Sequence, residues 1–162
     1  MEPNGREIKP DPKIIITNPQ LNVLNRQTIQ PEHMNEIYNL MDVFCYSTGG
    51  EGFGLPGLEC QAAGVPLLMT DYSSAIEIVC DKDLKIPILT DCYGRKIVEV
   101  GSNGVGNAVP DDKAIKNILD SLYQEWIKNK LEERIKRARN FAVMYDWDLI
   151  SEKWIKLFEE EA

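Results

Sequence analysis

The sequence contains few of the residues that build metal centres or redox sites. It has one histidine, His33, and four cysteines, at positions 45, 60, 80 and 92, with no CxxC pair among them. Zinc sites and thioredoxin-type motifs need closely spaced cysteines or histidines, so this spacing argues against both. We therefore expect no zinc site, and we predict reduced, buried thiols, with Cys45 in a strand and Cys60 in a helix. His33 is predicted to be a solvent-exposed residue in the first turn of a helix.

The sequence also lacks a basic excess and a long apolar run. Its 26 acidic and 18 basic residues give a formal net charge of −8, which excludes an overall attraction to nucleic acid or anionic lipid. No signal peptide and no apolar stretch long enough to span a bilayer are found, so we expect a soluble, cytoplasmic chain. With 162 residues, 43% of them hydrophobic, it is long enough for one domain with a core.

Apolar strands alternate with helices over much of the chain. Strands of this kind, apolar on both faces and separated by helices, form a parallel sheet that is covered on both sides. The sequence therefore predicts an α/β fold with a Rossmann-like parallel sheet, helices on both faces and a helical C-terminus. The predicted strands are 13–17, 42–47 and 65–71, and the predicted helices between them are 31–41, 55–63 and 73–79.

The pattern is weaker from Cys80 to Pro110 and becomes helical after it. Candidate strands lie at 86–90 and 96–100, and Gly101 to Gly106 is a candidate turn. The helices predicted beyond them are 111–128, 130–144 and 147–160, with Asp111 and Asp146 as N-caps.

Domain boundaries follow from the same patterns. We predict a tail or linker at 1–12, which is polar and rich in proline, a single domain at 13–146, and a C-terminal helix at 147–162. The three tryptophans, Trp126, Trp147 and Trp154, lie on helical segments and are predicted to anchor packing. The basic helix at 128–139 is predicted to be a charged, solvated face, with contact to a membrane surface as the alternative.

The stretch T-G-G-E-G-F-G-L-P-G-L-E, residues 48–59, lies between a predicted strand and a predicted helix. A glycine loop in this position brings backbone N–H groups and the positive end of the helix dipole up to an anion. Gly52 and Gly54 remove side chains that would block the approach of a phosphate. The loop therefore predicts a phosphate-containing ligand, and two kinds of ligand fit it.

A dinucleotide is one candidate ligand. From Gly52 the loop reads G-x-G-x-x-G, and Asp71 ends the next strand 19 positions later, where an NAD enzyme keeps its ribose-binding carboxylate. That fingerprint normally follows the first strand of its domain, whereas here a strand and a helix precede it. It also assigns no role to Glu51 or Glu59.

A nucleoside-diphosphate sugar is the other candidate. Glu51 and Glu59 are separated by seven residues and flank the start of the helix. A carboxylate suits a vicinal diol because it offers two acceptor oxygens. Glu51 would then bind the sugar and Glu59 the ribose, while the glycine loop holds the diphosphate between them.

Residues 42–71, D-V-F-C-Y-S-T-G-G-E-G-F-G-L-P-G-L-E-C-Q-A-A-G-V-P-L-L-M-T-D, resemble the donor-binding core of the group 1 (family 4) retaining glycosyltransferases of GT-B fold. The pattern of that family is approximately D-V-F-V-x-P-S-x-x-E-G-F-G-L-P-x-L-E-A-M-A-x-G-x-P-V-I-x-x-D. The resemblance extends to Glu77 in S-S-A-I-E-I-V and to A-R-N-F-A-V-M-Y-D-W-D before the last helix.

This resemblance implies the C-terminal, donor-binding half of a hexosyl-transferring enzyme. Such an enzyme transfers a glycosyl unit from a UDP- or GDP-sugar with retention of configuration, usually without a metal or other cofactor. Glu51 would be the catalytic residue and would hold the donor sugar. By this resemblance the donor-binding residues would be Glu59, Gly52, Phe53, Gly54, Leu55, Thr28, Ile29 and Glu77. Independently of the resemblance, Ser73 is a candidate phosphate contact at a helix start, with an ordinary N-cap as the alternative.

Two parts of the family pattern are not evident. One is the N-terminal acceptor domain. The other is the first strand–helix unit of the donor domain, with its Gly-Arg and Lys pair; Gly5, Arg6 and Lys9 have these residue types but lie in a proline-rich segment. We therefore expect an incomplete transferase, weakly active or inactive alone, that needs an acceptor domain or partner chain.

The expected acceptor is a glycan or a lipid-linked molecule. The expected location of the protein is the cytoplasm, with the inner face of the membrane as an option. Two alternatives stay open at this point. One is an NAD(H)-binding domain of an oxidoreductase, and the other is a module that binds a sugar nucleotide without catalysis.

Overall fold

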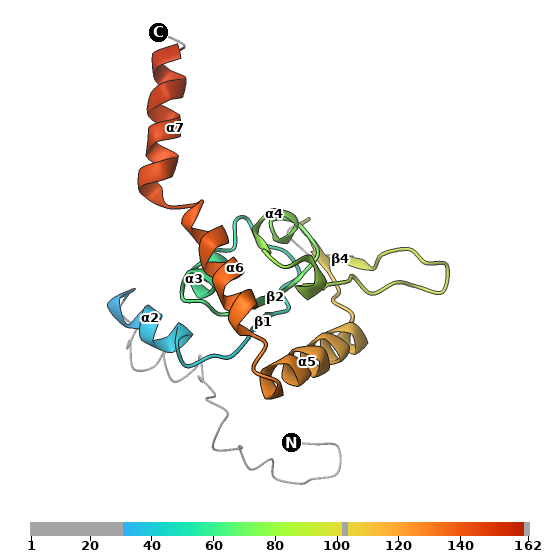
Figure 1. Cartoon of the computed structure of the whole chain (residues 1–162). Coiled ribbons are helices and arrows are strands. Elements are labelled where there is room, and N and C mark those ends of the chain that lie inside the picture. The colour runs from blue at the N-terminus through green and yellow to red at the C-terminus, as the bar shows by residue number, and fades with distance from the viewer. Residues whose placement is uncertain (1–30, 102–103, 161–162) are drawn as a thin grey trace, which may run out of the picture. The chain divides into compact units, whose positions relative to one another are not determined.

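The computed structural model describes residues 31–101 and 104–160 of the chain (Figure 1). The chain divides into two compact units, Met1–Pro31 and Glu32–Ala162, and the second contains nearly all of the described residues. The strand predicted at 13–17 and the candidate residues Thr28 and Ile29 lie outside the described part. Within that part, no helix is both long and apolar enough to cross a membrane.

A three-stranded parallel sheet forms the centre of the second unit. Its strands are β1 (Phe44–Tyr46), β2 (Leu67–Thr70) and β3 (Lys85–Ile86), in the order β1-β2-β3. Every residue of β2 is buried, as expected for the middle strand of a parallel sheet. The strands predicted at 42–47 and 65–71 are confirmed with shorter bounds, and the α/β fold with a parallel sheet flanked by helices is confirmed.

Helix α3 (Leu55–Ala62) connects β1 to β2 and packs against both strands. Pro56 lies in its first turn, where the missing N–H costs no hydrogen bond. A Cβ atom added at Gly57 would lie 2.9 Å from Leu67 Cδ2, so glycine is what allows α3 to approach β2 this closely. The helix ends before Gly64, whose φ of +85° is the left-handed conformation that glycine favours.

The remaining predicted helices are also present. Asp111 accepts hydrogen bonds from the N–H groups of Lys113 and Ala114 and is an N-cap as predicted, and Asp146 accepts one from the N–H of Asp148. Helix α6 packs against α3. The bounds are α2 (Pro31–Tyr38), α4 (Ala75–Ile78), α5 (Asp112–Ile127), α6 (Glu132–Val143) and α7 (Trp147–Glu160).

The weakly patterned region differs most from the prediction. The strand predicted at 86–90 is reduced to the end of β3, followed by isolated bridges from Ile88 to Pro110 and from Thr90 to Lys96. Strand β4 (Val98–Val100) is present, but it pairs antiparallel with β5 (Gly106–Ala108) in a separate two-stranded sheet. The turn predicted to extend to Gly106 is therefore too long, because Gly106 pairs with Val100.

Two predictions about packing were wrong. Trp126, Trp147 and Trp154 have exposed fractions of 50%, 80% and 54%, so they do not anchor the described core, and α7 buries no side chain. All four cysteines are free as predicted, and Cys60 is buried, but Cys45 and Cys92 are exposed. Cys45 lies on β1, which ends the described sheet, and its side chain points to the less covered side of that strand.

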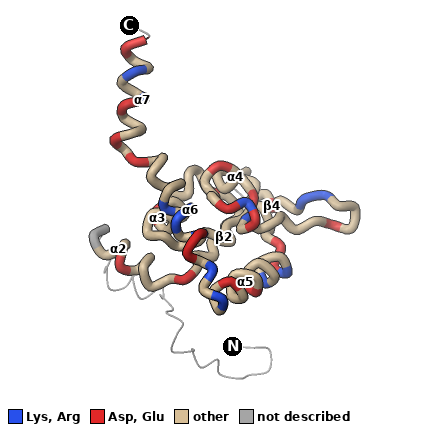
Figure 2. Tube along the Cα trace, viewed as in Figure 1, with Lys and Arg blue, Asp and Glu red and all other residues tan. Residues whose placement is uncertain are grey.

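Charged side chains join α5 and α6 to the short 3-10 helix η1 (Lys82–Leu84). Arg134, whose side chain is 12% exposed, forms ion pairs with Asp81, Asp83 and Glu125 at 2.6 to 2.8 Å. Arg137 pairs with Asp81 at 2.8 Å. Basic and acidic residues are interspersed here rather than gathered in one basic patch (Figure 2). The basic helix predicted at 128–139 thus uses two of its arginines for intramolecular ion pairs.

Candidate functional site

The glycine loop, residues 47–54, leaves the carboxyl end of β1 and enters α3. Ligands of open α/β sheets bind outside this end of the strands. The loop is also tied to the two-stranded sheet, because the N–H of Ala108 donates a hydrogen bond of 2.7 Å to the carbonyl of Gly49. The loop predicted from the sequence therefore lies where a ligand site is expected.

Four consecutive backbone N–H groups in this loop have no hydrogen-bond partner in the described structure. They belong to Gly52, Phe53, Gly54 and Leu55. Just beyond them, the N–H groups of Gly57 and Leu58 donate to the carbonyl of Gly54 and begin the helix. Unpaired N–H groups at the positive end of a helix dipole form an anion site.

The two central glycines differ in what surrounds them. A Cβ atom added at Gly52 would meet no atom within 4 Å, so the backbone there is open to a ligand. A Cβ atom added at Gly54 would lie 2.9 Å from Ile78 Cδ1, and Gly54 has a φ of +87°. Gly52 therefore leaves its backbone accessible, whereas Gly54 is required for the turn and for packing on α4.

Glu51 is held at the loop by three neighbours. Tyr46 Oη and Thr48 Oγ1 both donate hydrogen bonds to Glu51 Oε1, at 2.6 and 2.9 Å. The backbone N–H of Glu51 donates to Ser73 Oγ at 2.9 Å. The hydrogen bond to Glu51, together with burial, raises the pKa of Tyr46 to about 12, so this hydroxyl stays a donor at neutral pH.

Glu59 lies in the second turn of α3 and is exposed. Its Oε2 atom accepts a hydrogen bond of 2.8 Å from the hydroxyl of Tyr38, the last residue of α2. Tyr38 is 4% exposed, and burial together with this hydrogen bond raises the pKa of Tyr38 above its ordinary value. Both glutamates of the predicted pair therefore accept a hydrogen bond from a tyrosine.

Ser73 is brought to the loop by its contact with Glu51, and Glu77 is not. Ser73 has a φ of +52°, an uncommon conformation for a residue other than glycine, and its hydroxyl accepts the Glu51 N–H. The hydroxyl of Ser74 is buried without a partner among the described residues. Glu77 is exposed on α4, and the described residues show no hydrogen bond between it and the loop.

The side chains of Phe53 and Leu55 point outward, with exposed fractions of 45% and 57%. The ring of Phe53 meets the ring of Tyr145 edge to face, with 6.1 Å between centroids. Tyr145 lies between α6 and α7, so Phe53 connects the loop to the C-terminal helices. Its side chain thus packs on aromatic residues, while its backbone N–H remains available.

Asp71, the carboxylate that the dinucleotide alternative needs, lies 3.6 Å from the ammonium of Lys85. The side chain of Lys85 is 15% exposed and also donates a hydrogen bond to the carbonyl of Ile76. Asp71 therefore has a charged partner inside the domain. In residues 31–101 and 104–160, no group of three or more histidines, cysteines or acidic residues is arranged to hold a metal ion.

The tyrosine partners of the two glutamates could not be predicted from the sequence. Tyr38 and Glu59 are 21 residues apart, and Tyr46 lies on the strand before Glu51. The packing of α2 beside α3 brings the Tyr38 hydroxyl to Glu59, whereas Tyr46 reaches Glu51 from the end of the strand that precedes the loop. Thr48 was also missed, although its place three residues before Glu51 is compatible with a local side-chain contact.

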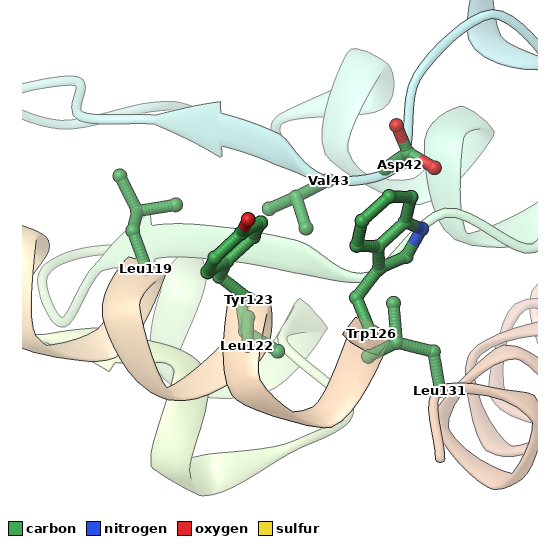
Figure 3. Close-up of a pocket in the computed structure, with 7 residues that line it drawn as sticks. All are labelled: Asp42, Val43, Leu119, Leu122, Tyr123, Trp126 and Leu131. Carbon is green, nitrogen blue, oxygen red and sulfur yellow. The ribbon is translucent and has the colours of Figure 1, made fainter. Parts of the chain in front are cut away.

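An apolar pocket of about 220 Å³ lies apart from the loop, between the start of β1 and α5 (Figure 3). The rings of Tyr123 and Trp126 stack at its edge, with centroids 5.9 Å apart. It shares no residue with the glycine loop and is not the predicted site. Its lining residues are Asp42, Val43, Leu119, Leu122, Tyr123, Trp126 and Leu131.

Comparison with known proteins decides the family. The family described as "Glycosyl transferases group 1" matches residues 16–141. The chain belongs to the group 1 glycosyl transferases. Its Rossmann-like sheet and helical C-terminus are consistent with the C-terminal half of a GT-B fold. This membership favours a glycosyltransferase over the dinucleotide-binding alternative.

Curated relatives of this group 1 domain carry transferase names. It is 25% identical over 134 residues to the UDP-N-acetylglucosamine--peptide N-acetylglucosaminyltransferase GtfA subunit of Streptococcus parasanguinis, covering 80% of this chain and 23% of that protein. It is 26% identical over 123 residues to phosphatidyl-myo-inositol mannosyltransferase of Mycobacterium tuberculosis, covering 75% of this chain and 28% of that protein. The chain thus spans about a quarter of their length. No solved structure gives a significant match.

Proposed function

We propose that this group 1 domain binds the nucleoside-diphosphate sugar donor of a glycosyltransferase. The observation that carries the proposal is the run of four unpaired N–H groups from Gly52 to Leu55, with Glu51 before it and Glu59 after it. The N–H groups and the helix dipole suit a diphosphate, and the two carboxylates suit hydroxyl groups on either side of it. A nucleoside-diphosphate sugar has this order of groups, with ribose and sugar flanking two phosphates.

In the proposed complex each part of the ligand has its own partner. Glu51 accepts hydrogen bonds from the sugar, and Glu59 accepts them from the ribose. The N–H groups stabilise the charge that develops on the diphosphate when its bond to the sugar breaks, which needs no metal ion. Ser73 and Glu77 are secondary candidates for donor contacts, and Thr28 and Ile29 for contacts with the base.

The transfer itself is proposed to be that of a retaining hexosyltransferase. The anomeric carbon exchanges its bond to the diphosphate oxygen for a bond to an acceptor oxygen, with the configuration kept. The chain covers only 23% and 28% of the matched relatives, which supports an acceptor site on additional polypeptide. Their names mention a peptide and a phosphatidyl-inositol, so we propose a glycan, peptide or lipid-linked acceptor, with weak or no transfer by this domain alone.

Isothermal titration calorimetry of the whole chain tests donor binding. The ligands are UDP-N-acetylglucosamine, GDP-mannose, the free diphosphates UDP and GDP, and NAD. We expect one sugar nucleotide to bind, with an affinity that EDTA does not change. Glu51→Ala should weaken the binding of the sugar nucleotide about tenfold and leave the binding of its free diphosphate unchanged. Glu59→Ala should weaken the binding of both ligands about tenfold.

Glu152→Ala, a change at an exposed residue of α7, is the matched control and should leave binding unchanged. Binding of NAD that is lost in Asp71→Asn would overturn the proposal in favour of the dinucleotide alternative. Release of free diphosphate from the bound sugar nucleotide, measured with and without added acceptors, then separates a transferase from a module that only binds.

A further inference from the structure

The two glutamates of the proposed donor site are held in the same way. Glu51 accepts both of its recorded hydrogen bonds, from Tyr46 and Thr48, on Oε1, and Glu59 accepts its bond from Tyr38 on Oε2. The other oxygen of each carboxylate has no donor in the described structure. Each glutamate therefore keeps one oxygen fixed by the protein and one oxygen available to a ligand.

An aromatic row connects the two tyrosines. The ring of Phe44 meets Tyr38 edge to face, with 6.2 Å between centroids, and stacks on Tyr46 at 5.3 Å. Phe44 and Tyr46 belong to β1, and Tyr38 is buried at the end of α2. Aromatic side chains have few rotatable bonds, so the row fixes both hydroxyls with little conformational freedom.

A carboxylate with one oxygen already bonded differs from a free one as a ligand-binding group. It cannot rotate without losing that bond, and it can offer only its other oxygen at full strength. Hydrogen bonds to a charged acceptor are among the stronger ones, so the restraint is substantial. The family pattern leaves position 46 unspecified, so the Tyr46 hydroxyl is a feature of this chain rather than of the motif.

We propose that Tyr46 and Tyr38 are positioning residues of the donor site. Tyr46 orients Glu51 so that its free oxygen meets a hydroxyl of the transferred sugar, and Tyr38 orients Glu59 toward the ribose. This inference rests on the proposed binding of a sugar nucleotide. It adds that the sugar and the nucleoside are bound by two separate tyrosine–glutamate pairs.

The proposal gives the two tyrosines different effects on two ligands. Both effects are measured by calorimetry with the sugar nucleotide that binds the wild-type chain most tightly, and with its free nucleoside diphosphate. Tyr46→Phe should weaken the sugar nucleotide about tenfold and leave the free diphosphate unchanged. Tyr38→Phe should weaken both by the same factor, because both ligands contain the ribose.

Matched variants separate positioning from a merely structural role. Tyr93→Phe removes the hydroxyl of a tyrosine that is 80% exposed, and it should change neither affinity. Glu51→Gln combined with Tyr46→Phe should bind the sugar nucleotide no more weakly than Glu51→Gln alone, because Tyr46 acts through the carboxylate. Melting temperatures of all variants report whether the domain stays folded.

The outcomes are distinct. If the wild-type chain binds sugar nucleotides but Tyr46→Phe changes neither affinity, or lowers both equally, the inference is wrong and the proposed function stands. Full additivity of Tyr46→Phe and Glu51→Gln also contradicts it. If the wild-type chain binds neither sugar nucleotides nor free diphosphates, the proposed function and the inference fall together.

Discussion

The amide of Gln61 on α3 donates a hydrogen bond of 2.8 Å to the backbone carbonyl of Ile78 on α4. The same amide nitrogen donates to the carbonyl of Gly57, and the amide oxygen accepts from the N–H of Cys80. Gln61 is 1% exposed, so these bonds replace water entirely. One side chain thus joins the helix that carries Glu59 to the helix that follows Ser73 and Ser74.

Replacing Gln61 by leucine should destabilise the domain strongly. Leucine fills a similar volume but leaves the carbonyl of Ile78 and the N–H of Cys80 buried and unpaired, which costs about 2 to 4 kcal/mol. Urea unfolding followed by circular dichroism measures the change. Gln124→Leu, at an exposed position of α5, is the control and should stay within about 0.5 kcal/mol of wild type. Equal effects of the two changes would contradict the role of the Gln61 amide.

Arg134→Ala should also be strongly destabilising. The guanidinium bonds Asp81, Asp83 and Glu125 at once, and its removal leaves three carboxylates together without their shared cation. A loss of about 3 kcal/mol in the free energy of unfolding is expected. Lys136→Ala removes an exposed cation that pairs on α6 alone and should cost less than about 0.5 kcal/mol. A small effect of Arg134→Ala would show that this network contributes little.

The same network sets a pH dependence. Hydrogen bonds from Arg134 lower the pKa of Asp83 and Glu125, and for Asp81 burial is outweighed by Arg137 and Arg134, which lower its pKa as well. A carboxyl whose pKa is lower in the folded state stabilises the fold above its unfolded pKa, near about 4, and loses this contribution as the pH falls.

The free energy of unfolding should therefore be level from about pH 7 to 5 and should fall below about pH 4. Urea unfolding across this range measures it. In Arg134→Ala the free energy of unfolding should fall less steeply with pH. Without the guanidinium, the pKa values of the three carboxyl groups differ less between the folded and the unfolded state. A slope that is unchanged by the substitution would assign the acid sensitivity to other groups.

Gly64 and Gly94 form a matched pair for testing steric contact at α6. Both have positive φ, +85° and +79°, but a Cβ atom at Gly64 would lie 2.6 Å from Arg139 Nε and 3.0 Å from Ile135 Cγ2, whereas one at Gly94 would meet nothing within 4 Å. Gly94→Ala should cost about 1 kcal/mol from backbone strain. Gly64→Ala should lower the stability of the domain clearly more than Gly94→Ala does. Thermal unfolding of both variants measures the two losses. Equal losses would show that α6 moves to make room for the added Cβ atom.

Removal of residues 147–162 should leave the domain folded with little change in stability. Helix α7 contains no buried residue, although its exposed side chains include Trp147, Trp154 and Phe158. Deleting it removes few core contacts, so the urea midpoint should stay nearly constant. A large fall in the midpoint would show that α7 covers part of the domain in solution.

Local patterns were enough to predict the helices and the strands around the glycine loop. Pro56 after an apolar strand, and Asp111 before an apolar helical repeat, act within one turn of the chain, and both behave as expected. The pairing of Val100 with Gly106 could not be read in this way. Their strand segments are short and exposed in part, and the pairing depends on contacts such as that of Gly49 with Ala108, 59 positions away.

The candidate site was predictable to the same extent. Glu51, Glu59 and the glycines form one continuous stretch, so their proximity follows from the sequence. Tyr38 reaches Glu59 only because α2 lies beside α3. The exposed position of Trp126 on α5 could not be predicted either. A tryptophan in an amphipathic pattern does not show which side of the helix packs on the rest of the domain.

The surroundings of Gly52 and Gly54 determine how a mutational scan of this domain should be read. Loss of ligand binding at Gly54 would report misfolding, because any side chain there collides with Ile78 and strains the backbone. Loss at Gly52, where a side chain has room, would report blocked access instead. If variants at both glycines are lost to the same extent in such a scan, the loss reflects the amount of folded protein at Gly54 and the access of the ligand at Gly52.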